Sequence, residues 1–334
     1  MTALAPHLSA YLREHLPRER AVSPHTVKTY ANCFVLLVQF AADRLKRRPT
    51  DLEVEDLGTD MIMAFLDHVE IGRGSCVRTR NGRLAAIRSF FRYIEYRIPA
   101  CLDQALRVRA IPTKKTDKAL IDYLDRAEIK ALLDTPDPRT RLGTRDRAML
   151  HLTYAGGLRV SELVTLQLGD FPDRSLSTMH IMGKGRRERV LPLWKETQIA
   201  LRAWLAIRPQ VEVTEIFLNA NGQPMTRDGF AFRLAEHVKT AATKQPSILG
   251  KRVTPHVLRH SCAMHTLAAT GDIRKVALWL GHASIQSTET YLRADPEEKL
   301  QILAAHGAPA IKPGRFKPPS DALITMLTDV RRRA

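Results

Sequence analysis

Apolar residues recur at helical spacing through the first third of the chain, from Leu8 to about Leu106. The segment VRTRNGRLAAIRSFFRYIEY (77–96) places its apolar residues on one stripe, which predicts a helix with one buried face. That stripe comprises Leu84, Ile87, Phe91 and Ile94. Another helix is predicted to begin after Ser23, a favoured N-cap residue, with Pro24 at its first position. These patterns predict an all-helical domain over residues 1–110.

The remainder of the chain alternates helical patterns with one strand pattern. Helices are predicted near 125–134, 143–155, 195–207, 226–242, 255–269, 272–280 and 284–292. Two runs rich in β-forming residues, STMHIM and RVLPL, flank the turn MGKGRRE and predict a β-hairpin with Lys184 near its tip. The second domain, residues 119–334, is therefore predicted to be α+β: mainly helical with one small hairpin.

A basic segment separates the two domains. RVRAIPTKKTDKAL (107–120) carries a proline and has no apolar period, so we place a linker at 111–118. The whole chain has 52 Lys and Arg against 35 Asp and Glu, a net charge of +17 spread along its length. This excess indicates a polyanionic partner such as nucleic acid.

A membrane and the cell exterior are both disfavoured by the sequence. The longest apolar run, CFVLLVQFAA at 33–42, is shorter than the roughly 18 residues that a spanning helix needs. The first residues lack the pattern of a secretory signal, and the four cysteines form no close pair. We therefore expect a cytoplasmic protein with reduced cysteines.

Several basic residues of the first domain and linker lie off the apolar stripe. They are Arg80, Arg83, Arg88, Arg92, Lys114 and Lys115. Any one of them is equally well explained as part of a solvated face. Their number favours contact with a DNA backbone.

The stretch TPHVLRHSCAMH (254–265) holds three histidines and one arginine. His256 and His260 have the spacing of a zinc-binding helix, but the glutamate of that motif is replaced by Val257, so no metal is expected. Thr254 as N-cap places His256 and Arg259 at the start of a helix, where both can reach one anion while His260 points elsewhere. This predicts half of a phosphate site, with ordinary surface residues as the alternative.

Four motifs in order extend this interpretation: AGGLRVSEL (155–163), GKGRRERVLPL (183–193), HVLRHS (256–261) and LGHASIQSTETY (280–291). From about Leu120 to Tyr291 the chain resembles the tyrosine recombinase family, the phage-integrase type of site-specific DNA recombinase. The resemblance implies an N-terminal core-binding domain and a C-terminal catalytic domain, and we expect the simple type without an arm-binding domain. It assigns an active site of Arg159, Lys184, His256, Arg259, His282 and the nucleophile Tyr291, with Glu162 in support and no cofactor.

The residue types suit a cleavage that conserves bond energy. Tyr291 would take the 3′-phosphate and free a 5′-hydroxyl, while Arg159 and Arg259 neutralise the transition state. Lys184 would protonate the leaving oxygen. His256 would accept the phenol proton or bind the phosphate, and His282 would bind phosphate or buttress Tyr291. Without the family pattern, Tyr291 would be interpreted as a half-buried helix aromatic and Lys184 as an exposed turn lysine. Glu162 could then be an ordinary ion-pair partner.

Two other functions stay open at this point, a type IB topoisomerase and an inactive DNA-binding relative. The expected partners are double-stranded recombination sites and further protomers in a tetrameric synaptic complex, with or without a partner recombinase. The biological outcome would be integration, excision or transposition of a mobile element, in association with the nucleoid.

The C-terminal tail (308–334) is expected to contribute to that assembly. Its last segment, SDALITMLTDVRRRA, has one apolar stripe of Leu323, Ile324, Leu327 and Val330. The stripe predicts a helix that docks on its own catalytic domain or, as we favour, on a neighbouring protomer.

Overall fold

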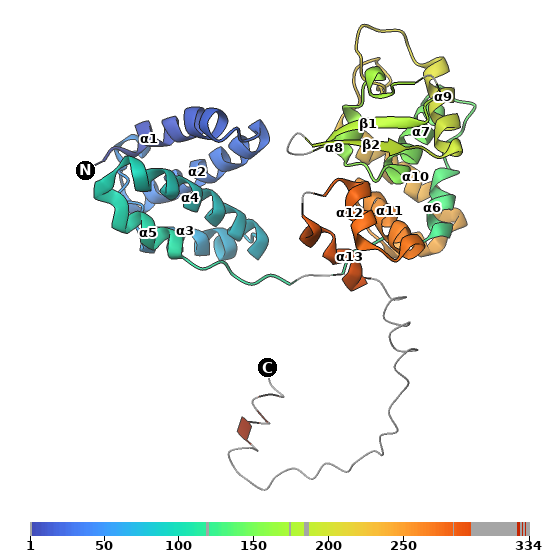
Figure 1. Ribbon diagram of the computed structural model, residues 1–334. Coiled ribbons are helices and arrows are strands. Elements are labelled where there is room, and N and C mark those ends of the chain that lie inside the picture. Colours follow the sequence, from blue (N-terminus) through green and yellow to red (C-terminus); the bar gives the residue numbers. More distant parts are fainter. Residues whose placement is uncertain are drawn as a thin grey trace. The chain divides into compact units, whose positions relative to one another are not determined.

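The computed structural model describes residues 2–117, 120–173, 175–183, 187–282, 284–294 and the single positions 326, 327, 329 and 331. The chain forms two compact units, Met1–Lys118 and Ala119–Ala334 (Figure 1). The described part is helical apart from one two-stranded sheet and isolated bridges. The predicted combination of an all-helical domain with a mainly helical α+β domain is confirmed.

The first unit is a bundle of five α-helices with short connecting turns. They are α1 (Leu4–Ala10), α2 (Pro24–Leu45), α3 (Thr59–Asp67), α4 (Val77–Arg97) and α5 (Leu102–Ala110), joined by the π-helical η1 (Tyr11–Glu19) and η3 (His68–Gly72) and the 3-10 turns η2 (Pro49–Asp51) and η4 (Pro99–Cys101). Ser23 caps α2 as predicted, its hydroxyl accepting from the Thr26 amide at 3.3 Å. The predicted stripe on α4 is completely buried in this unit's core.

In its described residues the second unit combines eleven helical or 3-10 elements with one hairpin (Figure 1). In chain order it contains α6 (Arg126–Leu133), α7 (Arg141–Ala155), α8 (Val160–Val164), η5 (Leu168–Asp170), β1 (Thr178–Gly183), β2 (Arg187–Pro192), α9 (Lys195–Ile207), α10 (Arg227–Lys244), η6 (Pro246–Gly250), α11 (Pro255–Thr270), α12 (Ile273–Leu280), η7 (Ile285–Ser287) and α13 (Glu289–Ala294). The strands pair antiparallel from Thr178 opposite Pro192 to Gly183 opposite Arg187, which confirms the hairpin.

One predicted helix differs from the structure. The pattern at 284–292 predicts a single helix, whereas the chain forms the 3-10 turn η7 and begins α13 only at Glu289. The Ser284 hydroxyl accepts from the Gln286 amide at 3.2 Å, a local bond that competes with α-helical pairing. Tyr291 therefore lies in the first turns of a separate short helix.

Helix α11 occupies the centre of the second unit, in contact with α7, α12 and α13. The turn after α7 approaches it closely at Gly157, which has a φ of +53°. A Cβ atom there would lie 2.5 Å from Leu280 Cδ2 and 3.2 Å from Cys262 Sγ. Glycine is required at this position for both its conformation and its lack of a side chain.

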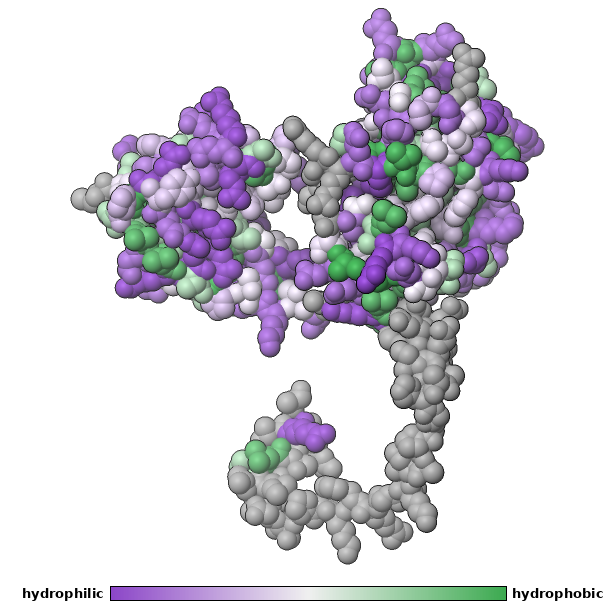
Figure 2. Space-filling view, in the orientation of Figure 1, coloured by the Kyte–Doolittle hydropathy of each residue, from purple (hydrophilic) through white to green (hydrophobic). Residues whose placement is uncertain are grey.

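The surfaces of both units are mainly hydrophilic on the face that Figure 2 shows, with apolar residues scattered among polar ones. Among the described residues, no helix combines the length and the hydropathy that crossing a membrane requires.

We predict that Gly157→Ala lowers the free energy of unfolding of the second unit by about 2 kcal/mol or more, because a strained φ and an overpacked contact both contribute. All three tryptophans (Trp194, Trp204 and Trp279) belong to this unit, so urea unfolding followed by tryptophan fluorescence measures it. The control is Gly250→Ala, whose Cβ would meet nothing within 4 Å. Equal unfolding midpoints for the two variants would contradict the tight packing at Gly157.

Candidate active site

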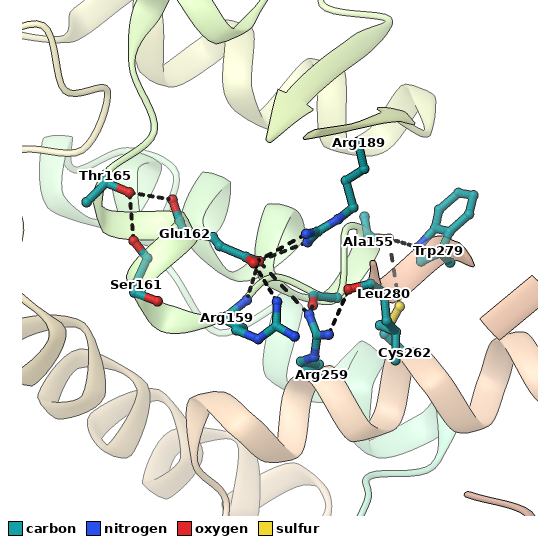
Figure 3. A network of polar contacts seen from close by, with 11 residues as sticks. Ala155, Arg159, Ser161, Glu162, Thr165, Arg189, Arg259, Cys262, Trp279 and Leu280 are labelled. Atoms are coloured by element: carbon teal, nitrogen blue, oxygen red, sulfur yellow. Dashed lines mark hydrogen bonds and ion pairs between the residues drawn. The ribbon is translucent and has the colours of Figure 1, made fainter. Parts of the chain in front are cut away.

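A single carboxylate, that of Glu162, lies among three arginines (Figure 3). Glu162 is at the start of α8, where its Oε2 accepts from the Arg159 amide at 2.9 Å and its Oε1 from Arg159 Nη1 at 2.7 Å. Arg189 reaches it from β2 with two hydrogen bonds, Nη2 to Oε2 at 2.8 Å and Nη1 to Oε1 at 3.3 Å. The third guanidinium, Arg259 of α11, has its Nη1 4.0 Å from Oε2.

The charge of this cluster suits an anionic ligand. Burial alone would raise the pKa of Glu162, but the hydrogen bond and charge of Arg189, together with Arg159, hold that pKa below its usual value. Burial and the charge of Arg159 lower the pKa of Arg259 to about 10, so Arg259 stays protonated at neutral pH. Three guanidinium groups thus face one carboxylate, and the cluster keeps a positive surplus that a phosphate can neutralise.

Backbone carbonyls fix the orientation of Arg259, which is buried. Its Nη1 donates to the carbonyl of Gly157 and its Nη2 to that of Leu280 at 2.8 Å (Figure 3). Arg259 therefore joins α11 to the turn after α7 and to the end of α12. A guanidinium has five N–H groups, so donors remain for a ligand.

Tyr291 of α13 lies beside this cluster and is almost completely buried. Its hydroxyl oxygen is 3.2 Å from Nδ1 of His260. Burial raises the pKa of Tyr291 to about 12, against the lowering effect of Arg259. The expectation that His260 points away from the site is wrong, because α13 packs against the side of α11 that carries this histidine.

The two histidines predicted for the site, His256 and His282, lie near Tyr291 without a hydrogen bond to it in the described part of the chain. His256 is exposed, and its ring packs edge-on against His260 with centroids 4.3 Å apart. His282 follows Gly281, which ends α12 with a φ of +63° as the sequence predicts. The His282 ring is parallel to that of Tyr291 at 6.4 Å, and its Nδ1 is 2.7 Å from the Thr288 hydroxyl.

The hairpin carries one site residue that the sequence predicts, Lys184, and one basic residue that it did not single out, Arg189. Lys184 lies outside the described residues, so its place in the site stays a prediction. Arg189, on the same hairpin, was not predicted. Its position in β2 is two residues before the buried Leu191, and alternate strand residues share a face, so the pairing pattern contained a signal for its burial.

Comparison with known proteins identifies the family. Residues 122–298 match the model "Phage integrase family", and residues 8–97 match "Phage integrase, N-terminal SAM-like domain". The chain is 39% identical over 328 residues to the "Putative integrase/recombinase y4rC" of Sinorhizobium fredii, covering 98% of each protein. It is 35% identical over 310 residues to "Tyrosine recombinase XerC" of Myxococcus xanthus, covering 90% of this chain and 97% of that one.

The chain belongs to the phage integrase family.

Solved structures share the fold of this phage integrase family member. A XerH site-specific recombinase bound to palindromic difH substrate matches with a TM-score of 0.64 and 21% identity over 89% of this chain and 84% of that one. The Tn1549 transposon integrase in complex with transposon right end DNA also matches with a TM-score of 0.64, at 18% identity over 91% of this chain and 100% of that one. Membership of the family makes the protein an enzyme that cleaves and rejoins DNA.

The basic residues predicted to bind DNA differ in their exposure. Arg92 and Lys115 are exposed, as a backbone contact requires. Arg80 is instead buried, with its Nε 3.4 Å from Glu70 Oε2. The prediction that Arg80 faces DNA is therefore wrong, because its guanidinium forms an ion pair with Glu70 inside the first unit. Lys114 is exposed but pairs with the same Glu70 at 2.8 Å.

Arg83 and Arg88 are half-buried. Arg88 donates to the carbonyl of Ile111 and so helps to hold the first residue of the predicted linker against α4. Arg83 keeps one buried nitrogen, Nη1, without a hydrogen-bond partner. Among the described residues, no group of three or more His, Cys, Asp and Glu side chains is arranged to hold a metal ion.

We predict that Glu162→Gln lowers the free energy of unfolding of the second unit by about 3 kcal/mol at pH 7, because three arginines lose their buried counter-charge. The pKa of Glu162 is lowered by folding, so its contribution is complete above the unfolded value of about 4.3 and decreases as the pH falls below it. Urea unfolding between pH 7 and pH 3.5 should show the difference shrinking.

The control for this prediction is Glu236→Gln, which removes an exposed ion pair with Lys239 and should leave the unfolding midpoint unchanged. A pH-independent difference between wild type and Glu162→Gln would show that charge is not what Glu162 contributes.

Proposed function

We propose that Tyr291 is the nucleophile of the cleavage step. The observation that carries this proposal is the position of its hydroxyl, beside Arg259 and the arginine cluster around Glu162 and bonded to an imidazole. The phenol oxygen attacks phosphorus, the bond to the 5′-oxygen breaks, and a 3′-phosphotyrosine conserves the bond energy for rejoining. Arg159 and Arg259 neutralise the extra charge of the transition state, each contributing about 10²–10³ in rate.

Lys184 is our candidate for the acid that protonates the leaving 5′-oxygen. The hairpin that carries it is joined to Glu162 by Arg189. This arginine lies in β2, the strand after the turn, and donates two hydrogen bonds to the Glu162 carboxylate. This connection supports a lysine that is delivered to the same phosphate that the arginines bind. His282 is proposed to buttress Tyr291, since their rings are parallel.

We propose a site-specific recombinase of a mobile element as the biological role, acting in the cytoplasm on chromosomal DNA. Its similarity over nearly the full length to proteins named integrase/recombinase and tyrosine recombinase supports this role. The helical unit and the linker, 1–110 and 111–118, would hold the DNA through exposed cations such as Arg92 and Lys115.

Four protomers on two sites are the proposed working assembly, with the tail of one protomer docked on the next. Most of the tail, 308–334, lies outside the described residues, but Met326 and Leu327 are helical and more than half exposed. The catalytic unit offers a mostly apolar cavity of about 350 Å³ lined by Tyr154, Trp194, Cys262 and Trp279. Exposed apolar side chains and an open apolar cavity on one chain support exchange between neighbours.

The nucleophile is tested with Tyr291→Phe on a nicked suicide substrate. We expect wild-type protein to accumulate a covalent DNA adduct and the variant to form none while binding DNA with unchanged affinity, because only the hydroxyl is lost. If the wild-type protein binds DNA but forms no adduct, the protein is an inactive DNA-binding relative of the recombinases. An adduct with the Phe variant would assign the nucleophile elsewhere.

Truncation after Pro319 tests the exchange of the tail. We expect single-site DNA binding to persist while the four-protomer complex on paired sites is lost, as measured by gel shift and light scattering. Leu323→Asp plus Leu327→Asp should behave like the truncation. Thr325→Asp plus Thr328→Asp, which adds the same charge off the apolar stripe, should assemble normally. Full assembly of the truncated chain would contradict the proposal.

A further inference from the structure

His260 is the side chain that contacts the reacting atom of Tyr291 in the described part of the chain. Its Nδ1 lies 3.2 Å from the phenol oxygen, within hydrogen-bond distance. The two rings meet edge to face, with centroids 5.6 Å apart and planes at 67°. The neutral phenol has one hydrogen to donate, and an imidazole nitrogen can accept it when the other ring nitrogen carries the proton.

The surroundings of His260 favour its neutral form, the form that accepts a proton. Burial lowers its pKa to about 4, and the charges around it act in the same direction. Those neighbours are His256 and Arg259 on its own helix and His282 from the loop after α12, with Tyr291 of α13 completing the environment. His256, Arg259 and His282 thus all disfavour a positive charge on the His260 ring in the free enzyme.

We propose that His260 is the general base that takes the proton of Tyr291 during cleavage, a role that rests on the proposed nucleophile. As the phenol oxygen bonds to phosphorus, its proton passes to Nδ1 of His260, the bond from phosphorus to the 5′-oxygen breaks, and that oxygen receives a proton from the general acid. On rejoining, the 5′-hydroxyl attacks phosphorus and gives its proton back to the group that acted as general acid. The bond from phosphorus to Tyr291 breaks, and His260 returns its proton to the phenol oxygen.

The transfer of the phenol proton from Tyr291 to His260 is favourable only while the bond to phosphorus forms. A phenol with a pKa raised to about 12 holds its proton in the resting enzyme. As the oxygen shares its electrons with phosphorus, the phenol proton becomes strongly acidic. The added negative charge of the phosphate also stabilises an imidazolium beside it. A weak base in direct contact therefore suffices and does not deprotonate the nucleophile prematurely.

The geometry favours His260 over the two histidines that the sequence singled out. His256 is exposed and contacts the ring of His260 rather than Tyr291. His282 Nδ1 is engaged with the Thr288 hydroxyl, and the His282 ring is parallel to the Tyr291 ring with centroids 6.4 Å apart. The hydrogen bond of the Tyr291 hydroxyl is with His260.

The variant His260→Asn tests whether His260 accepts the proton of Tyr291 or only positions its hydroxyl. The asparagine carbonyl can accept the phenol hydrogen bond in roughly the place of Nδ1 but cannot take up the proton. In single-turnover cleavage of a suicide substrate at saturating protein, we expect the variant to be about 10²–10³-fold slower at pH 7. Its rate should rise about tenfold per pH unit from pH 7 to 9, as preformed phenolate replaces the base, whereas the wild-type rate should be flat.

The control is His237→Asn, which alters a histidine of α10 that is bonded to Asp146 at 3.0 Å outside the site. It should cleave like wild type with the same flat pH profile. Near wild-type rates and a flat profile for His260→Asn would overturn the proposal and leave a positioning contact only. Thermal unfolding of each variant, compared with wild type, confirms that the folded proteins are being compared.

The experiments distinguish an error in the assignment of His260 from an error in the assignment of Tyr291. An adduct formed by Tyr291→Phe would remove the basis of both proposals. Loss of the adduct in Tyr291→Phe together with unimpaired cleavage by His260→Asn would overturn the base alone.

Discussion

The ion cluster around Glu162 is the interaction on which the catalytic unit depends. One buried carboxylate binds Arg159 at the start of α8 and Arg189 of β2, and it lies 4.0 Å from Arg259 of α11. Without that counter-charge, three guanidinium groups would repel one another in a region of low dielectric. The carboxylate thus brings together segments from distant parts of the sequence, and the cluster keeps a positive surplus at the proposed phosphate site.

Arg259 and Tyr291, the proposed phosphate ligand and the proposed nucleophile, are both almost completely buried in the second unit. Arg259 is fixed by the carbonyls of Gly157 and Leu280, and the close approach at Gly157 permits that contact. Tyr291 is buried against α11, and burial raises the pKa of its phenol to about 12. In the proposed mechanism this couples cleavage to DNA binding, since a protonated phenol is a poor nucleophile in the free enzyme.

Local signals in the sequence predicted much of this architecture, but they did not predict contacts between segments that are distant in the sequence. The Ser23 cap, the α4 stripe and the hairpin follow from short-range chemistry, and the structure has all three. The family motifs located the arginine pair and Tyr291 for the same reason, as patterns along the chain. The burial of Arg80 depends on Glu70, and the direction of His260 depends on where α13 packs; neither is visible in a helical period.

The central claim is that Tyr291, set in this cluster, forms the covalent link to DNA. Mass spectrometry of the tryptic digest after reaction with a nicked substrate and nuclease treatment tests it directly. The account predicts that the peptide of residues 276–293 carries the 3′-nucleotide on Tyr291. A nucleotide on any other residue, or an active preparation with unmodified Tyr291, would contradict it.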